Sequence, residues 1–480
     1  MDGAAGRPTD RAGSVSAGGP PAGGRPAELA DGLQRRREQR SWYFYDWANS
    51  AYVTTTLTVL FGPYLTAVAK RSACPALPSD ADCRVDLSVL GVPVSPGSLA
   101  LYAVTATTLI SALLLPIVGA LVDRSGNKRT MLARFAWLGA AAASALVFVA
   151  GNDWRLGVVL QLVASLSLGC SLVVYDAILI DIATPDERDA VSSRGWALGY
   201  LGGGLLLALD LVVVQAHATF GLSQSAAVRL SLLSAGVWWG AFTLIPYFGL
   251  KDRPPRAVLP EAGRGLLGAA FGQLAATLRD LRGYPQTLRF LLAYLFFNDG
   301  IQTVIAAASI FAAEQLGLPQ GQLITSILVV QFVAFGGALL FGRIAARVGA
   351  KRAVLASLAL WCAVVAAGFV LPAHRFGLFL ALAVLIGVVL GGSQALSRSL
   401  YSQLVPLGRE AEYFSLYQSA ERGTSWSGTL LFGLVFQLTH TYRAAIVALV
   451  VFFVLGGALL ARVDVRRGIL DAGNELPAVV

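Results

Sequence analysis

The chain has 480 residues, of which 56% are hydrophobic and only 14% are charged, and its mean hydropathy is +0.65. Soluble proteins carry about 25% charged residues, so this deficit excludes an ordinary soluble protein and indicates extensive contact with lipid. The formal charge of +9 does not indicate nucleic-acid binding, because the arginines fall between apolar segments rather than on one basic domain. Scarce lysine with abundant Ala and Gly is typical of a GC-rich bacterial genome.

The N-terminal part of the chain, 1–40, contains no long apolar stretch, and its first part, 1–34, is rich in Gly, Ala and Pro. A signal peptide would need an apolar region of about 7–15 residues. We therefore expect residues 1–40 to form a disordered cytoplasmic tail.

Twelve apolar segments follow this tail, and several reach the roughly 20 residues that a helix needs to cross a bilayer. They cover residues 42–69, 99–122, 130–150, 156–183, 194–214, 228–249, 287–313, 321–345, 353–372, 376–404, 412–438 and 443–462. We predict an all-helical membrane protein with twelve transmembrane helices in two six-helix lobes. The predicted parts are an N-terminal lobe (41–249), a cytoplasmic linker with an amphipathic helix (250–286), a C-terminal lobe (287–462) and a cytoplasmic tail (463–480).

The basic residues predict how the chain is oriented in the membrane. An even number of segments places both ends on one side, and Lys and Arg gather on the cytoplasmic side. With both ends inside, inner segments hold 28 of the 37 Lys and Arg residues and outer segments hold 7. We expect a multi-pass plasma-membrane protein with both ends in the cytoplasm.

The outer loop 70–98 contains two of the four cysteines, Cys74 and Cys83. A disulfide is compatible with that compartment, but the sequence alone does not show whether the geometry allows one. We leave open whether the pair is bonded. Cys170 and Cys362 lie within apolar segments and are expected to be packing residues.

A motif that follows the second segment recurs, with the same internal spacing, after the eighth. The first copy contains Gly119, Asp123, Arg124, Gly126, Lys128 and Arg129, and the second contains Gly342, Arg347, Gly349, Lys351 and Arg352. Both copies resemble the signature loop of the major facilitator superfamily, although Ala346 replaces the acid in the second. The glycines allow a sharp turn, and the charged groups can form ion pairs that hold one arrangement of the lobes. We interpret both copies as gating loops; a plain basic loop is the alternative.

Polar side chains inside the apolar segments are the candidates for binding a solute or a coupling ion, because lipid exposure would be costly. They are Tyr45, Asp46, Trp47, Asn49, Asp176, Asp299, Gln302, Thr303, Gln394 and Arg398. Asp46 and Asn49 share a helix face, and Asp299 and Gln302 repeat this spacing in the seventh segment. A carboxylate there could accept an ammonium group or a proton. Hydrogen bonding between helices is the alternative.

Asp176 and Arg398 occupy equivalent positions of the two halves, in the fourth and the tenth segment. Opposite charges at such positions suggest either an ion pair between the lobes or a site for a zwitterion, in which the arginine would hold a carboxylate. The alternative is that both residues are solvated near the cytoplasmic ends of their segments.

Four sequence blocks narrow the family. They are Tyr45–Tyr52 (YDWANSAY), Gly199–Gly203 (GYLGG), Gly391–Ser399 (GGSQALSRS) and Ala411–Tyr417 (AEYFSLY). Over residues 40–462 the chain resembles the unknown-major-facilitator family, which includes the fungal vacuolar effluxers. The resemblance implies the major facilitator fold, a cavity lined by the first, fourth, seventh and tenth segments, and export of amino acids or related solutes. The chain departs from the family pattern at Asp176, where Asn is expected.

We therefore predict alternating-access transport of a small polar solute, with an amino acid favoured and proton coupling plausible. Efflux of drug-like or cationic metabolites is one alternative, and a non-transporting membrane sensor or scaffold is another. The sequence contains no catalytic constellation or metal-binding cluster, and no phosphate-binding loop follows Gly202–Gly204. We expect no cofactor, no enzymatic activity and no nucleic-acid partner. The expected partners are the solute, protons and the lipid bilayer, with the chain acting as a monomer.

Overall fold

The computed structural model describes residues 24–76, 83, 85–254, 275–423 and 425–480. Within these residues the regular structure is helical except for one antiparallel hairpin, β1 (Leu87–Val89) and β2 (Val92–Val94), in which Leu87 pairs with Val94. The helices of the first half are α1 (Gly24–Ala51), a π-helix (Tyr52–Leu60), α2 (Phe61–Ala73), α3 (Leu99–Ser125), α4 (Lys128–Ala145), a 3-10 turn (Leu146–Phe148), α5 (Trp154–Ile182), α6 (Arg188–Gln215), α7 (Gln224–Phe242) and α8 (Leu244–Gly249).

The second half continues in the same manner. Its helices are a 3-10 turn (Leu281–Gly283), α10 (Pro285–Ile310), a π-helix (Phe311–Gln315), α11 (Gln320–Val348), α12 (Ala350–Val370), α13 (Phe376–Gln403), α14 (Glu410–Gly423), α15 (Ser425–Thr439), α16 (Tyr442–Ala448), α17 (Val450–Ala461) and α18 (Val465–Asp471).

Eleven segments of the described chain are long and apolar enough to cross a membrane. The consecutive helices α14 and α15, on either side of residue 424, occupy the place of the remaining predicted segment, 412–438. The prediction of an all-helical, multi-pass membrane protein is confirmed.

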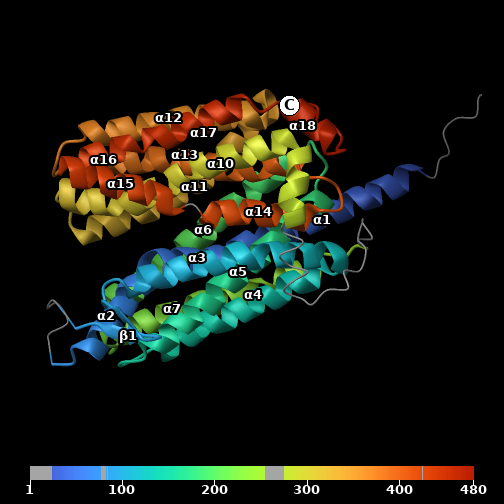
Figure 1. Cartoon of the computed structure of the whole chain (residues 1–480). Coiled ribbons are helices and arrows are strands. Elements are labelled where there is room, and N and C mark those ends of the chain that lie inside the picture. The colour runs from blue at the N-terminus through green and yellow to red at the C-terminus, as the bar shows by residue number, and fades with distance from the viewer. Residues whose placement is uncertain (1–23, 77–82, 84, 255–274, 424) are drawn as a thin grey trace, which may run out of the picture.

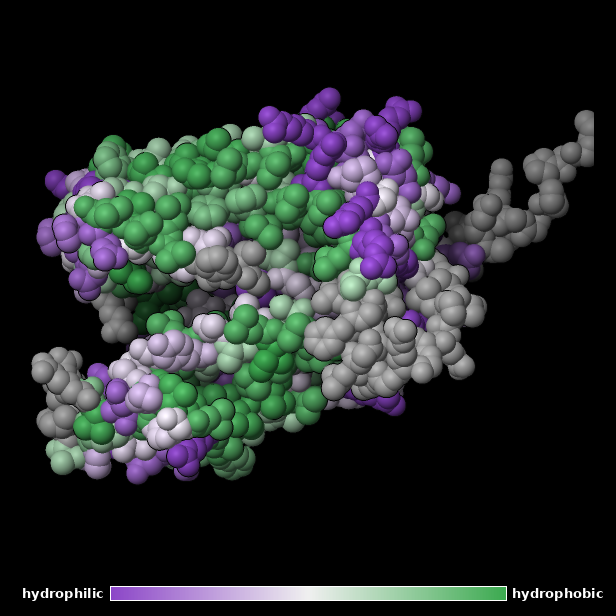
Figure 2. Space-filling model, in the orientation of Figure 1, coloured by the Kyte–Doolittle hydropathy of each residue, from purple (hydrophilic) through white to green (hydrophobic). Residues whose placement is uncertain are grey.

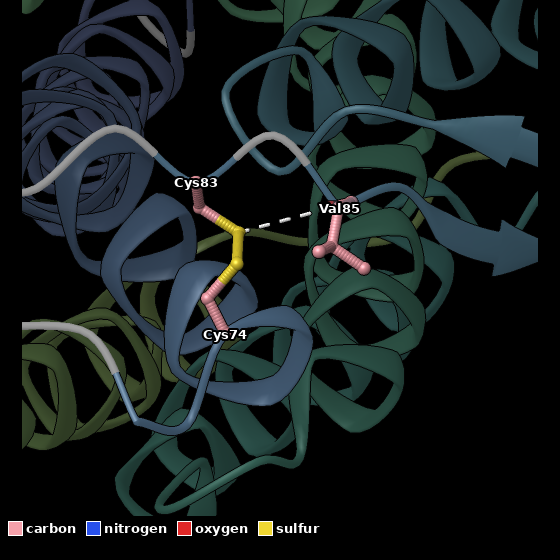
Figure 3. The surroundings of a disulfide bond; sticks show 3 residues. All are labelled: Cys74, Cys83 and Val85. Carbon is pink, nitrogen blue, oxygen red and sulfur yellow. Dashed lines mark hydrogen bonds between the residues drawn. A yellow bond between two sulfur atoms is a disulfide. The ribbon is translucent and has the colours of Figure 1, made fainter.

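The helices form two lobes that lie side by side (Figure 1). Helices α3, α4, α5 and α7 belong to the N-terminal lobe, and α10, α12, α13 and α17 belong to the C-terminal lobe. The start of α1 and helix α18 lie at one end of the bundle, which we call the terminal face. Helix α2 and strand β1 lie at the other end, which we call the disulfide face because a Cys74–Cys83 disulfide closes the loop there (Figure 3). The sequence alone left open whether Cys74 and Cys83 are bonded, and the structure contains this bond.

The expected disorder of residues 1–40 is wrong for residues 24–40, which are part of α1. This part of α1 is anchored by Glu38, which pairs with Arg253 at 2.7 Å, and by Gln39, which donates to the carbonyl of Ile182. The predicted amphipathic helix of the linker falls largely on residues 255–274, outside the described residues, although 275–280 are helical.

Candidate functional site

One buried arginine joins the two lobes. Arg398, on α13 of the C-terminal lobe, is only 2% exposed. Its Nη2 lies 3.0 Å from Oδ2 of Asp46, and its Nη1 lies 3.5 Å from Oδ1 of Asp176. Both acids belong to the N-terminal lobe, on α1 and α5. The structure therefore contains an ion pair between Asp176 and Arg398, and it adds Asp46 to the same group, as a buried charge requires partners.

Three aromatic rings surround this guanidinium. Its central carbon lies 4.9 Å from the ring centre of Trp42 and 5.3 Å from those of Tyr175 and Trp196, distances at which a cation is attracted to a ring face. Tyr175 also donates a hydrogen bond of 2.7 Å to Asp46. None of these three rings is among the residues predicted from the sequence. Trp42 could have been found, because it lies four residues before Asp46 on the same helix face.

The cluster of Arg398, Asp46 and Asp176 contains two carboxylates and one guanidinium. If both acids are ionised, it carries one excess negative charge. Gln418, on α14 of the C-terminal lobe, donates to the second oxygen of Asp176 at 2.8 Å, but an amide does not neutralise that charge. A proton on one carboxylate would bring the net charge of the cluster to zero.

Hydrogen bonds between α6 and α13 also join the lobes, both beside this cluster and nearer the terminal face. Ser192 donates to the backbone carbonyl of Ala395 at 2.7 Å, and Arg188 donates to that of Ser402 at 2.9 Å. All four residues are buried. The terminal half of the interface is thus sealed by polar contacts.

The C-terminal segment crosses the same face. Asn474 donates to the carbonyls of Gln403 and Val405 in the C-terminal lobe, each at 2.8 Å. The backbone N–H of Ala478 donates to Asp186, between α5 and α6 of the N-terminal lobe, at 2.6 Å. The segment therefore contacts both lobes.

The first signature loop contributes a contact between the lobes at α3 and α14. The two oxygens of Asp123 accept hydrogen bonds of 2.9 Å from the backbone N–H groups of Ala411 and Glu412, at the start of α14. A carboxylate at a helix N-terminus satisfies free N–H groups and is favoured by the helix dipole. Gly119 allows the approach, because a Cβ there would lie 2.5 Å from the carbonyl oxygen of Ala411.

The basic residues of this loop extend the contact. Lys128 lies 2.8 Å from Asp181 and 3.7 Å from Glu410 of the other lobe, and Arg129 lies 3.2 Å from Asp252. Asp181 was not among the predicted site residues, and its side chain is only 7% exposed. Arg124 is exposed at the end of α3.

The second signature loop shares the positive φ of its turn glycine with the first loop but makes different contacts. Gly126 and Gly349 both adopt positive φ, 65° and 88°, where glycine is unstrained. Gly342 marks the crossing of α11 and α6, because a Cβ there would lie 2.6 Å from the hydroxyl of Ser193. Lys351 binds carbonyls at the end of α17. The remaining positions, Ala346, Arg347 and Arg352, are exposed.

Toward the disulfide face the lobes diverge. Figure 2 shows a hollow between them on this side, bordered by apolar residues. A neutral hydrogen bond of 2.7 Å, from Gln331 on α11 to Thr54 in the first π-helix, joins the lobes here. The interface is therefore sealed at one end and open at the other.

Asp299, the repeat partner of Asp46, lies in different surroundings. It is fully buried on α10 and accepts hydrogen bonds from the hydroxyl of Ser427 and from the backbone N–H of Gly428 (2.9 Å), in the first turn of α15. The hydroxyl of Thr303, on the same helix, also interacts with this carboxylate. In the described part of the chain, no hydrogen bond or ion pair joins Asp46 to Asp299. The structure does not bring them into one cluster.

The other predicted residues lie nearby but are engaged within their own lobes. Asn49 donates to the carbonyl of Tyr45 one turn earlier, at 2.6 Å, and the hydroxyl of Tyr45 donates to Ser171. Trp47 stacks on Trp238, with ring centres 5.4 Å apart. Two further residues complete the set: Gln394 donates to Asn298 at 2.9 Å, and Gln302 is partly buried.

Solved structures of low sequence identity share this fold. A bacterial homologue of the iron transporter ferroportin in an outward-facing state superposes with a TM-score of 0.63 at 13% identity, covering 89% of this chain and 98% of that one. The major facilitator superfamily transporter FucP in the outward conformation gives a TM-score of 0.61 at 12% identity, with the same coverages.

Sequence comparison is more specific. An uncharacterized MFS-type transporter of Bacillus subtilis, YxiO, is 30% identical over 92% of this chain and 98% of its own length. Autophagy-related protein 22 of Pyricularia oryzae is 24% identical over 92% of this chain and 78% of its own length. The model of the family described as vacuole effluxer Atg22 like matches residues 34–473. The chain belongs to this family and is a secondary transporter of the major facilitator superfamily.

Proposed function

We propose that the chain transports a small polar solute, favouring amino acids, by alternating access, and that it works in the direction of export. The cluster around Arg398 is the observation that carries this proposal. It joins the lobes through charged groups on the sealed side of a hollow, so breaking it would open the terminal face. The amino-acid preference is supported by similarity to the Atg22-like effluxers.

Protons are the coupling ions that we propose. The two acids paired with Arg398 have one negative charge to spare, and protonation of Asp46 or Asp176 would weaken the attraction between the lobes. Asp299 is the second candidate, because its carboxylate is fully buried. Proton binding and lobe separation would then be linked thermodynamically.

We also propose the orientation and domain limits. The terminal face is taken as cytoplasmic from the distribution of Lys and Arg, which makes the described arrangement outward-open. The lobes comprise residues 41–249 and 287–462, and the transporter acts as a monomer in the plasma membrane. The two signature loops act as gates, with the acid present only in the first.

Flux measurements on purified protein in liposomes test the proposal. Labelled amino acids should cross the membrane, and an imposed pH gradient should change their flux. Asp46→Asn should abolish the effect of the gradient. Unchanged, gradient-dependent flux in this variant would remove Asp46 from coupling.

Cationic metabolites are a weaker candidate substrate class. The aromatic rings that would attract a cation are occupied by the guanidinium of Arg398 in this arrangement. Comparing amino acids with lipophilic cations in the same liposomes separates the two classes. A sensor or scaffold would move neither.

A further inference from the structure

A second arginine lies between the lobes, and the cluster around Arg398 does not include it. Arg422 belongs to α14, close to the middle of the α14–α15 segment, and its side chain is partly buried. It forms no ion pair or hydrogen bond with any residue that the structure describes, and its Nε is buried without a partner. The adjacent acid, Glu421, accepts a hydrogen bond from Tyr294 of its own lobe and attracts Arg422 only at longer range than an ion pair. A partly buried guanidinium whose Nε makes no hydrogen bond keeps donors free for a further partner, which points to a ligand that is absent from this structure.

Arg422 lies nearer the hollow between the lobes than Arg398 does. Arg422 is twelve residues into α14, about 18 Å from its start at 1.5 Å per residue. Arg398 is five residues from the end of α13, about 8 Å from the terminal face. Arg422 therefore lies about 10 Å further toward the hollow than Arg398.

The opposing surface belongs to the N-terminal lobe and is small and polar. A Cβ added to Gly169 of α5 would lie 3.7 Å from both Nε and Cζ of Arg422, so the guanidinium lies directly against this glycine of the other lobe. One turn away on α5, Ser165 shares a hydrogen bond of 3.1 Å with the hydroxyl of Tyr52. These hydroxyls can donate to an anionic oxygen.

We propose that Arg422 binds the carboxylate of the transported solute, between α14 and the Gly169 surface of α5. A guanidinium presents a planar pair of donors that matches a carboxylate. Because Arg422 and Gly169 lie on different lobes, a solute held there would sense the separation of the lobes. This inference rests on the proposed function for its transport consequences, but the binding of a carboxylate can be measured without transport.

The first arm of the test is binding. Purified protein is titrated with a panel of L-amino acids, each beside its primary amide, which keeps the ammonium group but lacks the carboxylate, and thermal stabilisation is measured. We expect the acids to stabilise the wild type more than their amides. Arg422→Gln should weaken binding of the acids at least about tenfold, the loss expected for a charged hydrogen bond, and should remove the preference over amides. Arg422→Lys should retain part of it.

A matched control is Arg375→Gln, because Arg375 is an exposed arginine before α13 and its replacement should leave both affinities unchanged. Equal affinities of wild type and Arg422→Gln for the acids, or no preference of the wild type for acids over amides, would overturn the inference. The second arm is flux of the same acids in liposomes. If the wild type binds acids through Arg422 but moves none, the proposed function fails and the binding site stands.

Discussion

The two ends of the lobe interface are held by different chemistry. Toward the terminal face the lobes are joined by buried charged groups: Arg398 with two acids, Asp123 with a helix N-terminus, and Arg188 with a carbonyl. Toward the disulfide face there is a hollow and a neutral bond between Gln331 and Thr54. Buried charges are costly once unpaired, so the sealed end should open only when a proton or solute replaces the lost partners.

One measurement can test this comparison throughout. Thr219 and Ala373 are exposed on loops at the disulfide face, one in each lobe. Spin labels on cysteines at these positions, with Cys170 and Cys362 replaced by serine, report how far the lobes are apart there. Closing of the disulfide face shortens the distance, and it must accompany opening of the terminal face.

The largest effect is expected from Arg398→Met. The variant leaves Asp46 and Asp176 buried without their cation, which destabilises the sealed end by about 3–5 kcal/mol. The label distance should shorten and transport should fall to background. Arg398→Lys keeps the charge but not the planar pair of donors, so its label distance and transport should lie between those of the wild type and Arg398→Met. An unchanged label distance in Arg398→Met would show that the cluster does not hold the lobes.

Asp123→Asn should have a smaller effect of the same sign. The amide keeps one acceptor but loses the charge at the start of α14, a loss of about 1–2 kcal/mol. The label distance should shorten and the flux should fall, each by less than in Arg398→Met. The control is Ala346→Asp, which restores the acid in the second loop at an exposed position and should change neither. If the control matched Asp123→Asn in size, the loops would not differ as the contacts indicate.

Asp186→Ala removes the acceptor for the backbone N–H of Ala478. This bond is neutral on the donor side and exposed, so we expect a shift of about 0.5–1 kcal/mol. The label distance should shorten slightly, with transport retained. A shift larger than that of Asp123→Asn would make the C-terminal segment, rather than the first signature loop, the main contact at this face.

Asp299→Asn should leave the contacts between the lobes unchanged. Because Asp299 binds α15 within its own lobe, the variant should lower thermal stability by a few degrees and leave the label distance unchanged. A shortened distance would show that Asp299 belongs to the mechanism that holds the lobes. Its effect on pH-dependent flux then tests whether it is a coupling site.

Several features of the site were accessible from the sequence because they follow from local spacing. The turn glycines of the two signature loops need positive φ wherever the loops lie, and both have it. Asp176 and Arg398 could be matched because the repeat relates equivalent positions. The same repeat relates Asp46 to Asp299 but did not predict their partners, since equivalent positions share a backbone location but not the side chains packed around them.

Apolar length and basic-residue placement determine by themselves that this chain crosses a membrane in two similar halves, because the cost of burying charge in lipid acts on each segment separately. Which charges meet was decided only by the packing of one lobe on the other. Arg398 contacts two acids and three aromatic rings, whereas Arg422, on a neighbouring segment, lies against a glycine of the other lobe. Contacts between segments that are far apart in the chain depend on how the lobes dock, and no local pattern carries that information.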